Sequence, residues 1–233
     1  MEKLYYGLIG AILAMLLVLA MLPEAALGQE RTFQVRARVL VVRDLTEHWE
    51  FVGTKDVLEL VDAAQQLVEY RLADLGVSLK TLRYLVVPDA APEHNTIEGW
   101  RYGHARRAWE RSQRVWRRRS ITMVYAPPLE GIYFAGWAST ICSVRGLALT
   151  HFNPFAEHAL LKTALVATHE MGHLVGGRHD NSCPATIMHS NVGRFLASEM
   201  YPQWSAQTRA EVEECIRRQR RWRRAQRRRN RRA

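Results

Sequence analysis

Five residues in one short segment have the types and spacing that suit a catalytic metal ion. His169 and His173 lie four residues apart in a stretch with helical character, so both imidazoles project from one face on successive turns. Glu170 follows the first histidine and can reach a metal-bound water without being a ligand. Gly176 can end the helix in a left-handed turn, which would bring His179 back as a third nitrogen ligand. Three neutral histidines and one water form an open, catalytic type of zinc site.

The complete motif is too specific to follow from the histidine content of the chain. With nine His in 233 residues, His-Glu-x-x-His alone is expected by chance roughly 0.025 times in such a chain. Requiring Gly at the eighth position and His at the eleventh lowers this expectation to roughly 6 in 100,000. The alternative, ordinary core or surface histidines in a helix, is therefore not favoured. We expect the other histidines near the motif to be surface or packing residues: His151, His158 and His189.

The segment HEMGHLVGGRHD, residues 169–180, resembles the long zinc motif of the metzincin metalloendopeptidases. That group also has a methionine-containing turn beneath the metal, and Met188 is the candidate for it here. The residue after the third histidine separates the metzincin families, and Asp180 makes the chain most similar to the adamalysin/reprolysin family. Asp180 in place of Cys also argues against the archaemetzincins. One departure is Thr186, because reprolysins usually place a Cys immediately before the Ile-Met pair.

The resemblance implies roles for further residues. Asp180 would make structural hydrogen bonds rather than bind zinc. Met188 would give the site a hydrophobic floor, although it could also be an ordinary core methionine. The strand that contains Gly136, Trp137 and Ala138 would be the edge strand that pairs with the backbone of a substrate.

The chain has three cysteines, and their pairing is open on sequence grounds. The resemblance implies a disulfide between Cys142 and Cys215, which leaves Cys183 as a free thiol or an intermolecular link. The alternative is a disulfide between Cys142 and Cys183.

Hydrophobic periodicity predicts an α/β fold, of the α+β kind, with one mixed sheet and helices packed against it. Thr54 is expected to cap the first helix, Pro154 to open the zinc-site helix, and Ser205 to cap the last helix. By resemblance this is a metzincin-like catalytic domain with a twisted, mixed five-stranded sheet, a zinc helix and a small C-terminal subdomain. The expected strands are 33–43, 77–87, 121–125, 131–138 and 144–152, and the expected helices are 54–75, 98–119, 154–175 and 206 onward.

The two ends of the chain differ from its middle. Residues 1–28 contain an apolar run from Leu4 to Leu22 followed by Pro23 and a small-x-small site, so they are expected to be a signal peptide or a membrane anchor. Residues 217–233 contain eleven Arg, which exceeds the net charge of +10 for the whole chain. This Arg-rich tail is read as a solvated helix extension or, alternatively, as a contact for an anionic surface or membrane. Residues 29–216 remain as the catalytic domain, without net charge.

These features predict an extracytoplasmic zinc endopeptidase, secreted or membrane-anchored, that holds one catalytic Zn²⁺ and hydrolyses protein or peptide substrates. The alternative is a catalytically weak or regulatory metal-binding protein held on an anionic surface by its tail. The neutral middle of the chain and the apolar N-terminal segment argue against a nucleic-acid-binding protein. We expect a monomer.

Overall fold

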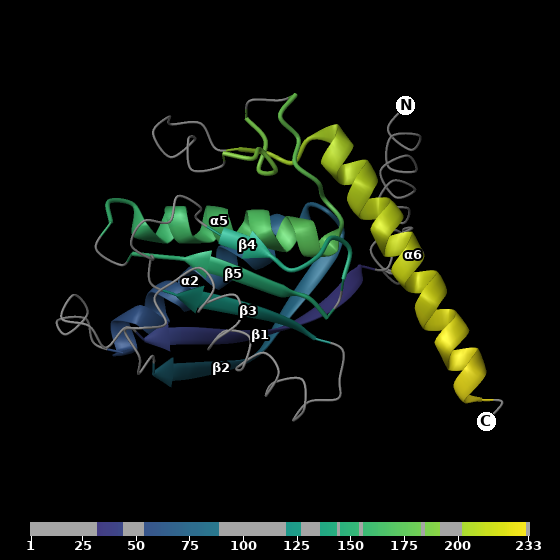
Figure 1. Cartoon of the computed structure of the whole chain (residues 1–233), viewed down its shortest axis with the longest axis horizontal. Coiled ribbons are helices and arrows are strands. Elements are labelled where there is room, and N and C mark those ends of the chain that lie inside the picture. The colour runs from purple at the N-terminus through teal and green to yellow at the C-terminus, as the bar shows by residue number, and fades with distance from the viewer. Residues whose placement is uncertain are drawn as a thin grey trace, which may run out of the picture. The chain divides into compact units, whose positions relative to one another are not determined.

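A computed structural model describes residues 32–43, 54–88, 120–126, 136–143, 145–153, 156–182, 185–191 and 202–231. Figure 1 shows a sheet of five strands with helices packed beside it. The elements follow in the order β1 (Phe33–Arg43), α2 (Thr54–Ala73), β2 (Val77–Pro88), β3 (Ile121–Ala126), β4 (Gly136–Ala138), β5 (Leu147–His151), α5 (Ala159–Val175) and α6 (Ala206–Asn230). All of them belong to one compact unit, Phe33–Ala233.

The sheet is mixed, with strand order β2-β1-β3-β5-β4. The first four strands in this order run parallel to their neighbours, whereas β4 runs antiparallel to β5 at the edge. The register of the edge pair places Gly136 opposite Thr150 and Ala138 opposite Ala148. The predicted α/β fold with a mixed five-stranded sheet is confirmed.

The burial of the strands follows their sequence patterns. Strand β3 lies between two parallel neighbours, and all six of its residues are buried, as expected for an apolar run in a covered sheet. In β1 the alternating apolar residues enter the core: Phe33, Val35, Ala37, Val39 and Val41. Tyr125 of β3 is fully buried, and its hydroxyl donates to Gln65 Oε1 of α2 at 2.9 Å. This bond ties the centre of the sheet to the helix that covers it.

Helices α2 and α5 contact each other and the sheet, α2 against β1 and β2 and α5 against β4 and β5. Apolar residues at helical spacing along α2 are buried, including Val61, Ala64, Val68 and Leu72. Thr54 is expected to cap this helix from the position before it, but Thr54 is the first residue of the helix itself. Burial of eleven of the seventeen residues of α5 makes this helix the central support of the site.

The expected start of α5 at Asn153-Pro154 is wrong. The helix begins at Ala159, five residues later. His158 has φ 56 and ψ 34, a left-handed conformation that interrupts a right-handed helix. Before it, the Ala156 N–H donates to Asn153 O and the Ala159 N–H donates to Ala156 O, which makes two turns. Asn153 is therefore the first residue of a turn, and α5 begins after it.

Helix α6 begins where the sequence predicts. Ser205 caps it, because the Ser205 hydroxyl accepts from the Thr208 N–H at 3.1 Å. The helix continues without a break through residue 216 into the Arg-rich segment and ends at Asn230. None of the described helices has the length and apolar character that a membrane span requires.

Several expectations lie outside the described residues. They are the apolar segment 1–28, the helix 98–119, residues 131–135 of the fourth expected strand, and Cys183. Within the described part, the fourth strand covers Gly136–Ala138 as expected, and the fifth is shorter than expected, at Leu147–His151. The boundaries 1–28, 29–216 and 217–233 stay predictions.

Candidate metal centre

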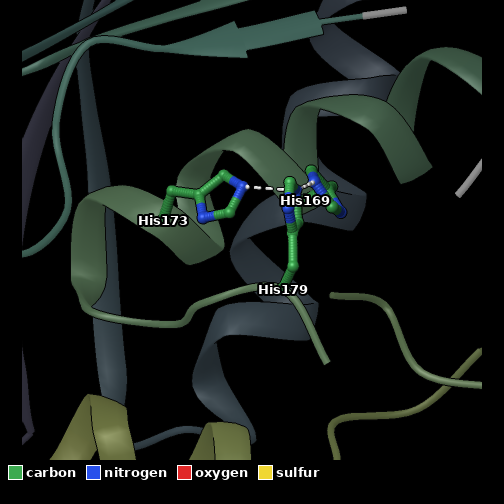
Figure 2. A group of neighbouring side chains, drawn as sticks. All are labelled: His169, His173 and His179. Carbon is green, nitrogen blue, oxygen red and sulfur yellow. Dashed lines mark hydrogen bonds between the residues drawn. The ribbon is translucent and has the colours of Figure 1, made fainter. Parts of the chain in front are cut away.

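Three histidines converge at the C-terminal end of α5. His169 and His173 come from successive turns of the helix, and His179 comes from the segment after it, as Figure 2 shows. The Nε2 atom of His179 lies 3.3 Å from Nε2 of His169 and 3.2 Å from Nε2 of His173. The ligand atoms of all three lie within 4.8 Å of one another, so the group could hold one metal ion.

These separations match those expected of zinc ligands. Zn–N bonds of roughly 2.0–2.1 Å at tetrahedral angles place two ligand nitrogens about 3.3–3.4 Å apart. The two Nε2 separations of 3.2 and 3.3 Å agree with that value. The donor set of three imidazoles suits zinc among the divalent metals, although copper, iron and nickel also accept it.

Backbone carbonyls orient two of the rings. His169 Nδ1 lies 2.7 Å from Ile187 O, and His173 Nδ1 lies 2.9 Å from Gly177 O. A carbonyl can only accept, so each Nδ1 must carry the proton and donate it. Each Nε2 then has a free lone pair directed at the centre of the group. This is the usual arrangement for a ligating histidine.

The third histidine depends on the glycine turn that ends α5. The Gly176 N–H donates to His173 O at 3.0 Å and the Gly177 N–H donates to Gly172 O at 2.8 Å, which closes the helix end. Gly176 has φ 125, and a Cβ added there would lie 2.5 Å from Cβ of Cys215. Only glycine fits this conformation and this close approach. The turn therefore brings His179 back towards α5, as the sequence predicts.

The electrostatics of the group favour neutral imidazoles. The pKa of His169 is lowered to about 4, mainly by burial and further by the nearby His173, His179 and His189, against the raising effect of the Ile187 hydrogen bond. Burial also lowers the pKa of His173 and of His179. All three are therefore neutral near pH 7, which is the form that binds metal.

Glu170 lies in α5 between two of these histidines and faces the edge of the sheet. Its side chain is 5% exposed. A Cβ added at Gly136 of β4 would lie 2.7 Å from both Cγ and Oε1 of Glu170, so the bare backbone of β4 makes room for this carboxyl. Burial raises the pKa of Glu170 from its ordinary value of 4.5 to about 8. No side chain in the described part of the chain forms an ion pair with it.

The raised pKa predicts how Glu170 affects stability in metal-free protein. Ionisation costs free energy in the folded state, so stability is highest below pH 4.5 and is lost as the pH rises towards 8. In Glu170→Gln this loss should disappear. From pH 5 to pH 8, the variant is expected to gain about 3 kcal/mol in unfolding free energy relative to the parent. Urea unfolding of both chelator-treated proteins at the two pH values measures this, and a difference that does not change with pH would contradict the assignment.

Met188 and Asp180 form a structural support next to the three histidines, through packing against α5 and through hydrogen bonds. Met188 is fully buried, and a Cβ at Gly172 would collide with its Sδ atom, so the methionine packs directly under the helix. The His189 N–H donates to Thr186 O at 3.1 Å, which makes Met188 part of a turn. The Asp180 N–H donates to Met188 O at 2.9 Å, and the carboxylate of Asp180 accepts from the N–H of Ser182 at 3.1 Å. Asp180 does not belong to the group that could hold a metal, so its role here is structural.

Three further histidines in the described part of the chain do not belong to the three-histidine group. His151 is buried in β5, and His158 is a largely exposed residue 3.4 Å from the Glu157 carboxylate. His189 Nδ1 accepts from the Asn191 N–H at 3.0 Å. None of these three belongs to the group that could hold a metal among the described residues.

Sequence reasoning missed three backbone contributions to the site. These are the carbonyls of Ile187 and Gly177, which orient the rings, and the bare Cα of Gly136, which accommodates Glu170. Carbonyls leave no signature in a sequence, because every residue type has one. Gly136 was singled out only as part of an edge strand.

A disulfide between Cys142 and Cys215 fixes the end of α5 against α6. The N–H of Cys142 donates to His173 O at 3.0 Å, and the N–H of Ser143 donates to Leu174 O at 2.8 Å. The bond from Ser143 satisfies a carbonyl that the helix end would otherwise leave without a partner, and the bond from Cys142 adds a second donor to His173 O, which also accepts from the Gly176 N–H. Because Cys142 is paired with Cys215, the alternative pairing with Cys183 does not form.

Removal of this disulfide should destabilise the fold. It joins residues 73 positions apart, and the closed loop predicts a loss of about 2–4 kcal/mol in Cys215→Ala. Denaturant unfolding measures the loss. As a control, a reductant should lower the stability of the parent to that of the variant and leave the variant unchanged. Equal stability of parent and variant without reductant would contradict the prediction.

Comparisons with known proteins give no family. No protein-family model matches the chain, and no curated protein is similar to it in sequence. Among solved structures, the chain is similar to metalloproteinase-II from Bacteroides fragilis, with 15% identity, a TM-score of 0.46, and coverage of 80% of this chain and 55% of that one. It is also similar to a chain in the structure of a chaperone-substrate complex, with 16% identity, a TM-score of 0.47, and coverage of 69% and 28%.

The chain thus spans about half of the first of these proteins and under a third of the second. At this identity and these TM-scores, neither similarity carries an argument about function. The functional argument rests on the three histidines and Glu170.

Proposed function

We propose that the chain is a zinc-dependent endopeptidase of the metzincin type, most similar to the adamalysin/reprolysin family. The observation that carries this is the convergence of three neutral imidazoles beside a buried carboxyl, with the Nε2 atom of His179 at zinc-ligand separations from those of His169 and His173. Asp180 after the third histidine and the buried Met188 in a turn support the family assignment. Thr186, which stands where reprolysins usually have a Cys, is the departure from it.

His169, His173 and His179 would hold the zinc ion through their Nε2 atoms. A zinc ion bound there supplies Lewis acidity, which polarises a peptide carbonyl and makes a water more acidic. Glu170 takes a proton from the attacking water at a carboxylate oxygen and then gives it to the nitrogen of the leaving amine. A carboxyl whose pKa lies at about 8 without metal is suited to both accepting and releasing a proton near neutral pH.

Strand β4 supports the proposed binding of an extended substrate. It is the edge strand of the sheet and pairs only with β5 among the described strands. An unpaired strand edge can hydrogen-bond an extended peptide. Gly136 is on this strand and next to Glu170, so a peptide paired with β4 would run past the carboxyl. Gly136, Trp137 and Ala138 are therefore the proposed substrate-binding residues.

Gly136 tests this arrangement without touching a metal ligand. In Gly136→Ala the new Cβ would lie 2.7 Å from Glu170 Oε1 and 2.8 Å from Leu149 O. The carboxyl has to move, and a displacement of about 1 Å at a reacting group costs roughly a hundredfold in rate. We expect kcat/KM for a peptide substrate to fall by about that factor while bound zinc stays at the parent level. Full activity in a folded, zinc-loaded variant would refute the placement of Glu170.

The proposed location is outside the cytoplasm, either secreted or anchored to a membrane. The disulfide between Cys142 and Cys215 supports an oxidising compartment, and the apolar run in residues 1–28 supports export. The Cys pair lies at the end of the zinc-site helix, so loss of this bond would affect the site directly.

The test of the proposed function is peptide cleavage by the full chain. The protein is folded under oxidising conditions and incubated with a mixed peptide library, then treated with a chelator and resupplied with Zn²⁺. We expect internal peptide bonds to be cleaved, cleavage to stop on chelation and to return with zinc. Bound zinc without any cleavage would refute the endopeptidase and favour the regulatory metal-binding protein.

A further inference from the structure

The second half of α6 carries a dense positive charge that the metal site does not use. Nine Arg lie between residues 217 and 229, and the last acidic residue of the chain is Glu214. Over this stretch the helix is about 20 Å long. Like charges at i,i+4 spacing destabilise a helix, so a partner that neutralises them would be favourable.

Contacts with the body of the protein hold this helix in one orientation. Cys215 is bonded to Cys142, and the Gln219 side-chain amide donates to Cys142 O at 3.2 Å. Further along, Arg223 lies over the Phe33 ring at 4.6 Å from its centroid, and the Arg223 guanidinium donates to Gln34 O at 3.4 Å. One side of α6 is therefore fixed against the body as far as residue 223.

The opposite side of α6 presents arginine. Positions 217, 221, 224 and 228 follow the helical spacing i, i+4, i+7, i+11, so their side chains form one stripe, and all four are exposed. Arg217 and Arg221 pair with the exposed carboxylates of Glu213 and Glu214. Arg224, Arg227 and Arg228 are exposed and form no ion pair with any described residue. These three arginines are together called the outer cluster: Arg224 and Arg228 are the members of the stripe without acidic neighbours, and Arg227 lies beside them.

We propose that the outer cluster binds an anionic phospholipid bilayer and holds the folded unit at the membrane surface. A straight helical stripe on a fixed helix matches a flat anionic surface, where each Arg adds attraction within a Debye length. The apolar run from Leu4 to Leu22 would bring the same chain to a bilayer. A nucleic acid is less suited, because residues 29–216 have no net charge. This proposal does not depend on the metal site.

Binding of the full chain to vesicles tests the proposal. We compare vesicles of phosphatidylcholine with vesicles that contain about one third phosphatidylglycerol. At 50 mM NaCl we expect at least about tenfold tighter binding to the anionic vesicles, and at 500 mM NaCl we expect less than about a twofold difference. The variant Arg224→Glu/Arg227→Glu/Arg228→Glu should lose the preference. A control with the same change in net charge, Lys55→Glu/Lys80→Glu/Arg145→Glu on the body, should keep it.

Proteolysis gives a second readout, which remains useful when the apolar segment holds the chain on both kinds of vesicle. Trypsin should cut the Arg-rich end at least about tenfold more slowly on anionic than on neutral vesicles, and the control variant should behave like the parent. Equal preference in the outer-cluster and control variants would overturn the proposal. Tight, cluster-dependent binding to single-stranded RNA without any preference for anionic vesicles would also overturn it.

Discussion

Glu170→Gln is expected to lower kcat/KM for peptide cleavage by roughly 100- to 10,000-fold while the protein still binds one zinc ion. Glutamine keeps the size of the side chain but cannot accept a proton from the attacking water. Glu170 is not one of the three residues that could hold the metal, so its loss should leave zinc binding intact. Steady-state kinetics on one peptide from the library, with zinc measured in the same sample, give both values.

The same substitution should make the metal-free protein more stable at pH 8, because it removes a buried carboxyl whose pKa is about 8. An inactive variant with full zinc and higher metal-free stability is hard to explain by misfolding. Cleavage within a factor of about three of the parent would show that Glu170 is not the general base. Loss of zinc together with activity would instead make Glu170 part of the metal site.

His179→Ala is the second large effect we expect. Zinc binding worth about 10–16 kcal/mol over four ligands gives roughly 3 kcal/mol for each, so zinc affinity should fall by over a hundredfold. His179 is the most exposed ligand of the three, so its removal costs little packing. Zinc titration measured by competition with a chromophoric chelator gives the change in Kd, and cleavage should fall with zinc occupancy.

His189→Ala is the matched control for this variant. His189 lies close enough to affect the pKa of both His169 and His179, yet it does not belong to the metal-binding group. We expect its replacement to change zinc affinity by less than about threefold, which is small compared with the loss of a ligand. A larger loss in His189→Ala than in His179→Ala would mean that the third ligand has been misassigned.

The sequence predicted the site better than the elements around it. The spacing of His169 and His173 determines that they share a helix face, and Gly176 determines that the chain turns back to His179, so local geometry was sufficient. The start of α5 was predicted wrongly because Pro154 is compatible with a turn as well as with a helix start. The left-handed backbone at His158, which sets the real boundary, has no glycine to indicate it.

Contacts between distant segments were beyond sequence reasoning. Ile187 orients His169 through a carbonyl eighteen residues away, and Gly136 accommodates Glu170 from another strand. Both depend on how the sheet, α5 and the Met188 turn pack together. Similarly, the residues after 216 gave no sign that Arg223 would contact Phe33 at the start of β1.

The most direct test of the central claim is zinc titration of the metal-free full chain combined with X-ray absorption at the zinc edge. The account predicts saturation at about one zinc per chain, with three imidazole nitrogens at roughly 2.0–2.1 Å and one further light ligand. A variant in which His169, His173 and His179 are all alanine should bind no zinc at the same concentrations. A folded parent that binds no zinc, or a triple variant that binds it as tightly as the parent, would contradict the account.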